Sequence, residues 1–477
     1  MDTSRSVARN HEPAAMPATE TARTEPAAVT GRAFGWFSIA RLGLIQACLG
    51  AVVVLATSTL NRVMVVELAL PAVLPGLLVA MHYVVQLLRP RMGFGSDQSG
   101  RCTPWILGGM VVLASGGLLG AWSVTRMDDT LASAIALAVL AFVMIGVGVS
   151  ACGTSVLVLL AKRVPERRRA GAATMVWLMM IAGFAVTAGI AGKQLDPYSE
   201  ARLLVVAATV AAIAVSMTAM LLIGLEGRRD GDVGEAQPGP REFVRTLSEV
   251  WREPAARQFT IFVFVSMLAF SAQDLILEPF AGSVFAYTPG QSTQLSGLQH
   301  AGILVGMLLV AAAGSGRIFG RKLGSLRFWT VSGCVASACA LAGLVMAGVV
   351  GPGWPLAANV MLLGAANGAF SIAAIASMMR LAGEGRARRE GTRMGLWGAA
   401  QALAFGFGGL LGTALSDLAR LVINDTALAY ATVFGLEAVL FILSARLAAA
   451  IREPQPEPQG NSASPGIKPN IQETAHA

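Results

Sequence analysis

Two acidic residues stand out in this sequence because they interrupt a long apolar stretch. Asp274 and Glu278 are four residues apart, so in a helix they share one face. Carboxylates inside a membrane span are costly, and they usually face an interior or a partner. In one interpretation the pair lines a central cavity and binds a polar ligand or a proton. In the other, the carboxylates lie near the outer end of a span, and Asp274 forms a structural ion pair with Arg62.

Two histidines also fall inside apolar stretches, at corresponding places in the two halves of the chain. The segment Leu77–His82 recurs as Leu295–His300, at an offset of 218 residues. A neutral imidazole is a common metal ligand. The alternative is a histidine that forms a hydrogen bond with a neighbouring helix.

The composition is that of a membrane protein. The chain has 477 residues, of which 55% are hydrophobic and only 13% charged, whereas a soluble domain carries about 25% charged residues. The net charge of +8 does not indicate nucleic-acid binding, because the arginines lie in short loops between apolar stretches. No spacing of His and Cys suits a metal, and we find no nucleotide-binding loop or catalytic triad. We therefore expect no metal site, no catalytic residue and no enzymatic activity.

Twelve apolar windows of about 20 residues are each long enough to cross a bilayer. They lie near residues 40–60, 70–90, 104–124, 130–160, 172–192, 201–225, 258–280, 295–314, 327–350, 355–379, 394–416 and 427–450. The sequence thus predicts an all-α polytopic membrane protein.

Basic residues predict the orientation of these spans, because Lys and Arg accumulate in cytoplasmic loops. Twenty-three Lys and Arg residues lie in the loops that follow even-numbered spans, and five lie in the loops that follow odd-numbered spans. Those five are Arg62, Arg126, Lys193, Arg202 and Arg420. Both termini are therefore expected in the cytoplasm.

A repeat divides the spans into two pseudo-symmetric halves of six helices. Gly100-Arg101 recurs as Gly320-Arg321, and Arg169–Trp177 recurs as Arg389–Trp397, both at an offset of 220 residues. Parallel six-helix halves are the plan of the major facilitator fold. The predicted regions are a disordered tail (1–35), the N-terminal half (36–225), a cytoplasmic linker with an amphipathic helix (226–257), the C-terminal half (258–452) and a second disordered tail (453–477).

A polar loop between the second and third spans carries the most specific motif. Gly93, Asp97, Gly100 and Arg101 follow one another at a spacing that resembles the loop signature of the major facilitator superfamily. We interpret them as a gating or structural loop. Arg169 and Arg389 begin the fifth and eleventh spans, where they either anchor the helix to the membrane or contact Asp97.

Four stretches are similar to the PucC/LhaA family: Leu60–Leu68, Leu70–Gly76, Gly93–Asp97 and Gln273–Pro279. The resemblance covers residues 36–450 and is greater to the LhaA branch. It implies a factor of the bacterial inner, intracytoplasmic membrane that assembles the photosynthetic core light-harvesting antenna. It also implies delivery of bacteriochlorophyll, whose magnesium a histidine can bind. His82, His300, Asp274 and Glu278 are then the candidate pigment or ligand residues.

The resemblance also implies partners, namely the antenna polypeptides, and in addition the pigment synthase and the membrane insertion machinery. Two other functions remain open. One is a secondary transporter of a small organic solute, with Asp274 and Glu278 in its cavity. The other is a scaffold that gathers these partners without touching pigment.

Overall fold

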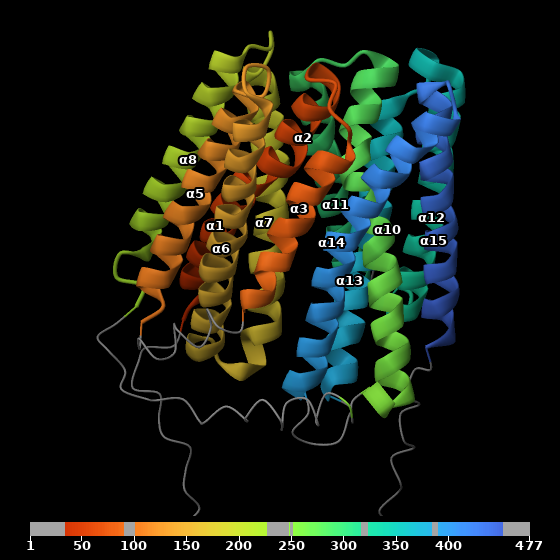
Figure 1. Ribbon diagram of the computed structural model, residues 1–477. Helices are drawn as coiled ribbons and strands as arrows, with labels where there is room; N and C mark the ends of the chain where they lie inside the picture. The colour runs from red at the N-terminus through yellow and green to blue at the C-terminus, as the bar shows by residue number, and fades with distance from the viewer. Residues whose placement is uncertain are drawn as a thin grey trace, which may run out of the picture.

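The computed structural model describes residues 34–89, 101–226, 248, 251–315, 323–383 and 390–451. Within these residues the regular elements are all helical, and they form one upright bundle (Figure 1). The first helix combines α1 (Trp36–Val54), a π-helical segment (Leu55–Thr59), α2 (Leu60–Arg62) and a second π-helical segment (Val63–Glu67). The others are α3 (Val73–Val85), α5 (Thr103–Thr125), α6 (Leu131–Arg163), α7 (Glu166–Gln194), α8 (Glu200–Leu222), α10 (Pro254–Phe285), α11 (Pro289–Ser315), α12 (Leu326–Val350), α13 (Leu356–Gly383), α14 (Glu390–Val422) and α15 (Thr426–Ala450).

Eleven of the described helices are long and apolar enough to cross a membrane, and α3 is a shorter apolar helix. The chain is thus a multi-pass membrane protein, and the twelve predicted spans correspond to these twelve helices. The second differs most from its predicted extent of 70–90. Pro71 and Pro75 accompany the start of α3, and a 3₁₀ turn (Gln86–Leu88) precedes Pro90. Proline is tolerated in a first helical turn but disfavours helix in the residue before it, which confines the helix.

The first helix is longer than the sequence indicated. It runs for 32 residues from Trp36 to Glu67, whereas the predicted span ended at residue 60 and left Arg62 and Glu67 in an outer loop. That prediction was wrong because the apolar run Val63–Val66 lets the helix continue past the charge of Arg62.

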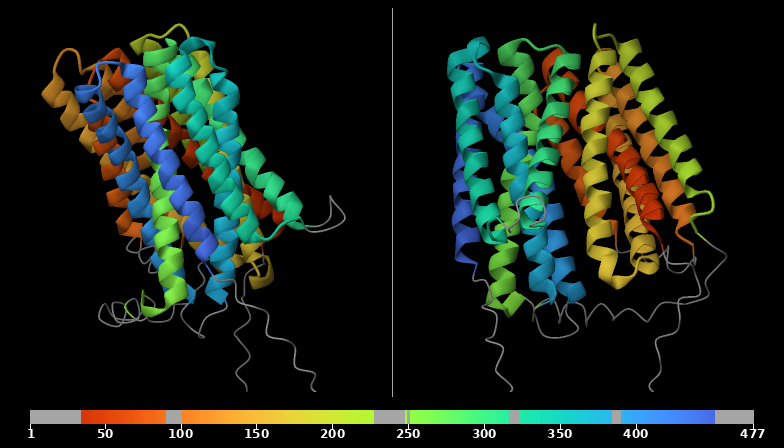
Figure 2. Two further views of the ribbon diagram at one scale, coloured as in Figure 1. Left: turned by 90° about the vertical axis from the view of Figure 1, so that its right-hand side faces the viewer. Right: turned by 180° about the vertical axis from the view of Figure 1, so that it is seen from behind.

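The helices form two halves that stand side by side, α1–α8 and α10–α15 (Figures 1 and 2). Two helix pairs make the most extensive contacts between them, α7 with α11 and α3 with α14. Glycines permit the close approach of α7 to α11, because a Cβ added at Gly192 would lie 2.6 Å from the carbonyl oxygen of Gly290. This arrangement is the major facilitator fold. The division into predicted regions at residues 226–257 stays a prediction.

The described chain begins and ends at the same end of the bundle (Figure 1). The Phe34 N–H donates to the carbonyl oxygen of Arg163, at the end of α6, over 3.0 Å. This is the predicted cytoplasmic end, and the opposite end is called the outer end below. The predicted disordered tails lie almost entirely outside the described residues.

Candidate functional site

The predicted gating loop is only partly described. Gly93, Asp97, Gly100 and Arg389 lie outside the described residues, so their roles stay predictions. Arg101 lies just before α5. Arg169, in the first turns of α7, donates from Nε to the carbonyl oxygen of Val164 at 3.1 Å. Arg169 therefore closes the turn between α6 and α7.

Arg62 is buried in the first helix with 2% of its surface exposed, and its partner is Glu67. The Arg62 Nη1 and Glu67 Oε1 atoms are 2.8 Å apart, and Arg62 Nη2 donates to the carbonyl oxygen of Tyr287 at 2.6 Å. The predicted ion pair between Arg62 and Asp274 is not formed in this structure. The two side chains lie at different levels along α10, because the Arg62 guanidinium packs against Gly282, two helical turns beyond Asp274.

Asp274 and Glu278 lie on α10, as predicted, and both contact neighbouring helices. Gln299 Nε2 of α11 donates to Asp274 Oδ1 at 3.1 Å. Glu278 is only 2% exposed and accepts a hydrogen bond from the Ser58 hydroxyl of the first helix. Asp274 thus belongs to a contact within the C-terminal half, and Glu278 to a contact between the halves.

Two further hydrogen bonds join the first helix to the C-terminal half. Asn61 Nδ2 donates to the carbonyl oxygen of Leu275 at 2.7 Å, and the Thr59 and Thr293 hydroxyls are 3.1 Å apart. We call this set the polar seam. It consists of Ser58, Thr59, Asn61, Arg62, Asp274, Glu278, Thr293 and Gln299. Since a π-helical segment shifts the register of the following side chains, the segment Leu55–Thr59 and α2 together turn four of the five residues from Ser58 to Arg62 toward the partner half.

His82 is buried, and its Nε2 atom has a hydrogen-bond partner one turn later in the chain. It is 2% exposed, and its Nε2 lies 3.0 Å from the amide nitrogen of Gln86. Because Arg89 donates to Oε1 of Gln86, the amide NH₂ group faces the imidazole and donates to it. The Nε2 lone pair is therefore occupied and Nδ1 carries the proton. His82 does not fit the role of a metal ligand in this structure.

In His300 the hydrogen-bond partner is at Nδ1, whereas in His82 it is at Nε2. The His300 Nδ1 lies 2.9 Å from the carbonyl oxygen of Ser296, one turn earlier on α11. A carbonyl oxygen can only accept, so Nδ1 carries the proton and Nε2 keeps its lone pair. Metal-binding histidines usually have such a hydrogen bond on the other ring nitrogen, because it fixes the tautomer and the ring orientation. The partly exposed His300 ring fits a ligand role.

The surroundings of His300 are apolar and cross the boundary between the halves. Phe184 of α7 meets the imidazole edge-on at a centroid distance of 5.0 Å. Ile181 of α7 and Ile303 and Met307 of α11 form the buried centre of an adjacent cluster, which we call the inter-half cluster. Its partly buried members are Trp177, Leu178, Met180, Phe184, Phe270, Leu304 and Ile372. Aromatic rings and thioethers are adaptable neighbours for a flat apolar ligand.

Two further acidic residues, Glu437 and Asp417, are not among the candidates predicted from the sequence. Glu437 is 2% exposed in α15, and among the described residues neither carboxyl oxygen has a hydrogen-bond partner. Asp417 of α14 accepts from the backbone N–H groups of Ala72 at 3.0 Å and Val73 at 2.7 Å. Glu437 was detectable as the one acid amid the apolar span 427–450, whereas the capping of α3 by Asp417 depends on tertiary placement.

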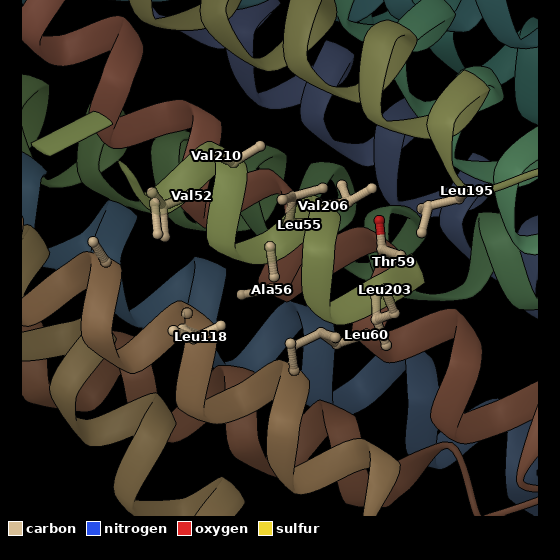
Figure 3. A pocket seen from close by; sticks show the side chains of 15 residues that line it. Val52, Leu55, Ala56, Thr59, Leu60, Leu118, Leu195, Leu203, Val206 and Val210 are labelled. Carbon is tan, nitrogen blue, oxygen red and sulfur yellow. The ribbon is translucent and has the colours of Figure 1, made fainter. Parts of the chain in front are cut away.

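An apolar crevice opens on the N-terminal half between the first helix, α5 and α8 (Figure 3). It encloses about 380 Å³ of empty space, including its open mouth. Thr59 is the one labelled side chain with an oxygen atom, and the others, such as Leu55 and Val206, are hydrocarbon. This crevice suits a hydrocarbon chain, but it offers no nitrogen ligand.

The arrangement as a whole is suited to binding. In the described part of the chain, no group of three or more His, Cys, Asp or Glu residues is placed to hold a metal ion. The polar seam is occupied by hydrogen bonds, most of them between the halves. His300 differs because it presents a lone pair beside an apolar, partly aromatic surface.

Comparison with known proteins agrees with this fold. Solved structures with the same fold include a D-xylose-proton symporter, with a TM-score of 0.65 and 14% identity, covering 87% of this chain and 98% of that one. A peptide transporter POT variant gives a TM-score of 0.66 at 14% identity, covering 88% of this chain and 96% of that one. At these identities the likeness shows the fold alone.

Relatives in sequence are more informative. The chain is 54% identical over 417 residues to the bacteriochlorophyll synthase 44.5 kDa chain of Rhodobacter capsulatus, covering 87% of this chain and 96% of that protein. It is 27% identical to protein PucC of the same organism, covering 85% and 90% of the two chains. The family model described as PUCC protein matches residues 59–455. This multi-pass membrane protein therefore belongs to the PucC family.

Proposed function

We propose that this protein is an assembly factor for the photosynthetic core light-harvesting antenna, which holds bacteriochlorophyll and passes it to antenna polypeptides in the membrane. Its family and its relative named as a bacteriochlorophyll synthase chain support a role in photosynthesis. A carrier of this kind needs a pigment site but no catalytic residue. The proposal accordingly assigns no enzymatic step to the chain.

The geometry of His300 carries the pigment-binding part of the proposal. A bacteriochlorophyll is a flat apolar ring whose magnesium accepts an axial ligand, so its binding requires one lone pair beside an apolar surface. His300 supplies the lone pair at Nε2, since its Nδ1–H is held by the Ser296 carbonyl. Phe184 and the inter-half cluster supply the apolar surface.

The two histidines of the repeat have different roles in this proposal. His300 binds the pigment, while His82 of α3 has a structural role, because its ring accepts a hydrogen bond from Gln86 in the following turn. Glu278 is assigned to the contact between the halves, through Ser58. Asp274 is assigned to positioning, because Gln299, its hydrogen-bond donor, is the residue just before His300.

Access to His300 requires movement between the halves. Phe184 and His300 lie on α7 and α11, which pack against each other across the boundary. A pigment ring must therefore separate these two helices at the level of His300. Major facilitator halves move against each other as rigid bodies, and we propose that this motion opens the site.

The partners in this proposal are the antenna polypeptides, and the pigment synthase and insertion machinery that act before and after the carrier. The protein would lie in the bacterial inner, intracytoplasmic membrane with both termini in the cytoplasm, as its basic loops indicate. Protein purified mildly from pigmented cells tests the proposal. We expect a bacteriochlorophyll absorption band and co-purifying antenna polypeptides, and protein without either would contradict it.

A solute transporter is the second candidate, and the fold and the partly exposed Asp274 favour it. Such a transporter would cycle between open states around a polar cavity. Uptake of a small organic solute by purified protein in liposomes, abolished by Asp274→Asn, would support it over the pigment carrier. The remaining alternative, a pigment-free scaffold, predicts co-purifying antenna polypeptides with no pigment band.

A further inference from the structure

A second pocket lies at the predicted cytoplasmic end of the C-terminal half. It is formed by the first turns of α10 and α12 and the last turns of α13 and α15, and it encloses about 380 Å³ of empty space, including its mouth. The residues that line it are Phe259, Phe262, Arg327, Thr330, Ser377, Arg380, Leu381, Ala448 and Ile451. It is separate from the polar seam and from His300, since none of their residues line it.

The polar part of this pocket is positively charged. Arg327 and Arg380 enter it from α12 and α13, and no acidic residue is among the described residues that line it. Arg327 Nη2 donates to the Ala449 carbonyl at the end of α15, a contact that holds the guanidinium at the rim. A guanidinium has five donors, so others remain to face the pocket. The hydroxyls of Thr330 and Ser377 also line it, but they donate to the carbonyl oxygens of Leu326 and Ala373, so the arginines are its remaining donors.

The apolar part distinguishes this pocket from a site for a free anion. Phe259 and Phe262 are 1% and 0% exposed and form a hydrocarbon wall beside the arginines, together with Leu381 and Ile451. The pocket also lies at the ends of four membrane-spanning helices, which is the level of the lipid headgroups. Basic pockets between transmembrane helices on the cytoplasmic side bind anionic lipid headgroups.

We propose that this pocket binds the phosphate of an anionic phospholipid from the cytoplasmic leaflet. Arg327 and Arg380 bind the phosphate. The upper part of an acyl chain lies against Leu381 and Ile451, which are partly exposed and are backed by the buried Phe259 and Phe262. Because α10, α12, α13 and α15 all contribute, the bound lipid ties together the cytoplasmic ends of the C-terminal half.

Lipid retention by the purified full-length protein tests this proposal. The protein is reconstituted in nanodiscs that contain equal amounts of phosphatidylglycerol and phosphatidylcholine. It is then released from the nanodiscs, and native mass spectrometry counts the lipids of each kind that stay bound. We expect about tenfold preference for phosphatidylglycerol, reduced to near unity in Arg327→Gln/Arg380→Gln, because the two arginines provide the charge that attracts an anionic headgroup. The matched control is Arg252→Gln/Arg257→Gln, which removes two exposed arginines from the same end and should keep the preference.

Three outcomes would overturn the proposal: an unchanged preference in the pocket variant, an equal loss in the control, or displacement of the lipid by millimolar inorganic phosphate. The last would assign the pocket to a free anion. Should the double variant fail to fold, Arg327→Gln alone, at the exposed rim, is expected to reduce the preference about threefold. Arg327→Lys/Arg380→Lys keeps the charge and should retain most of the preference.

Discussion

Phe184 of α7 meets the imidazole of His300 of α11 at a ring-centroid distance of 5.0 Å and an interplanar angle of 65°. The other boundary between the halves has a related contact, in which Tyr83 of α3 stacks on Phe405 of α14 at 5.5 Å. The repeat thus places one aromatic contact at each helix pair. Only the α7–α11 contact has a histidine with an available lone pair, so the two pseudo-equivalent positions have diverged in chemistry.

A double-mutant cycle tests the assignment of Arg62 to Glu67. Arg62→Gln should destabilise the protein by about 1–3 kcal/mol, because it leaves the carboxylates around it without their cation. We expect a coupling energy of at least about 0.5 kcal/mol between Arg62→Gln and Glu67→Gln, measured by unfolding in detergent. The control cycle pairs Arg62→Gln with Asp274→Asn, for which coupling should be near zero. A larger coupling energy between Arg62 and Asp274 than between Arg62 and Glu67 would contradict this assignment and support the ion pair between Arg62 and Asp274.

The twelve spans could be predicted from apolar windows, and the halves from the offset of 220 residues, because both are properties of local composition and repetition. The burial of the Arg62–Glu67 pair within the first helix could not be predicted in this way. It depends on the continuation of the first helix to Glu67 through two π-helical segments, and no apolar window reports that. The repeat also predicted equivalent roles for His82 and His300. Their difference arises from Gln86, whose amide donates to the ring of His82, and from Arg89, which orients that amide.

Asp417 should hold the outer end of the two halves together, because its carboxylate on α14 caps the N-terminus of α3. We expect Asp417→Ala to cost about 1 kcal/mol, which is typical of a lost cap. It should also increase labelling of Ala72→Cys by an impermeant maleimide, in a background without other cysteines.

Asp425 provides the matched control for Asp417. Its side chain accepts from the Leu428 N–H and caps α15 within one half. Asp425→Ala should have a similar cost in stability but leave the labelling of Ala72→Cys unchanged. Equal labelling in both variants would show that Asp417 does not join the halves.

Gly192 should be required for the close approach of α7 to α11. A Cβ there would lie 2.6 Å from the Gly290 oxygen and 2.8 Å from the Gln294 nitrogen. Because backbone atoms cannot move aside as a flexible side chain can, Gly192→Ala should destabilise the protein by about 1–3 kcal/mol. Thermal unfolding in detergent measures this effect.

Gly189, one turn earlier on α7, is the control for Gly192. A Cβ at Gly189 meets no atom within 4 Å, and alanine is favoured over glycine in a helix by about 1 kcal/mol. Gly189→Ala should therefore be neutral or slightly stabilising. If both alanine variants unfolded alike, the contact at Gly192 would not determine the packing of the halves.

The pigment content of His300→Ala tests the central claim most directly. The variant and the wild type are purified from the same pigmented cells, and bacteriochlorophyll per protein is measured by absorption, with His82→Ala as the matched control. The account predicts that His300→Ala loses most of its pigment, while His82→Ala keeps it. Full pigment retention by a folded His300→Ala protein, or an equal loss in both variants, would contradict the account.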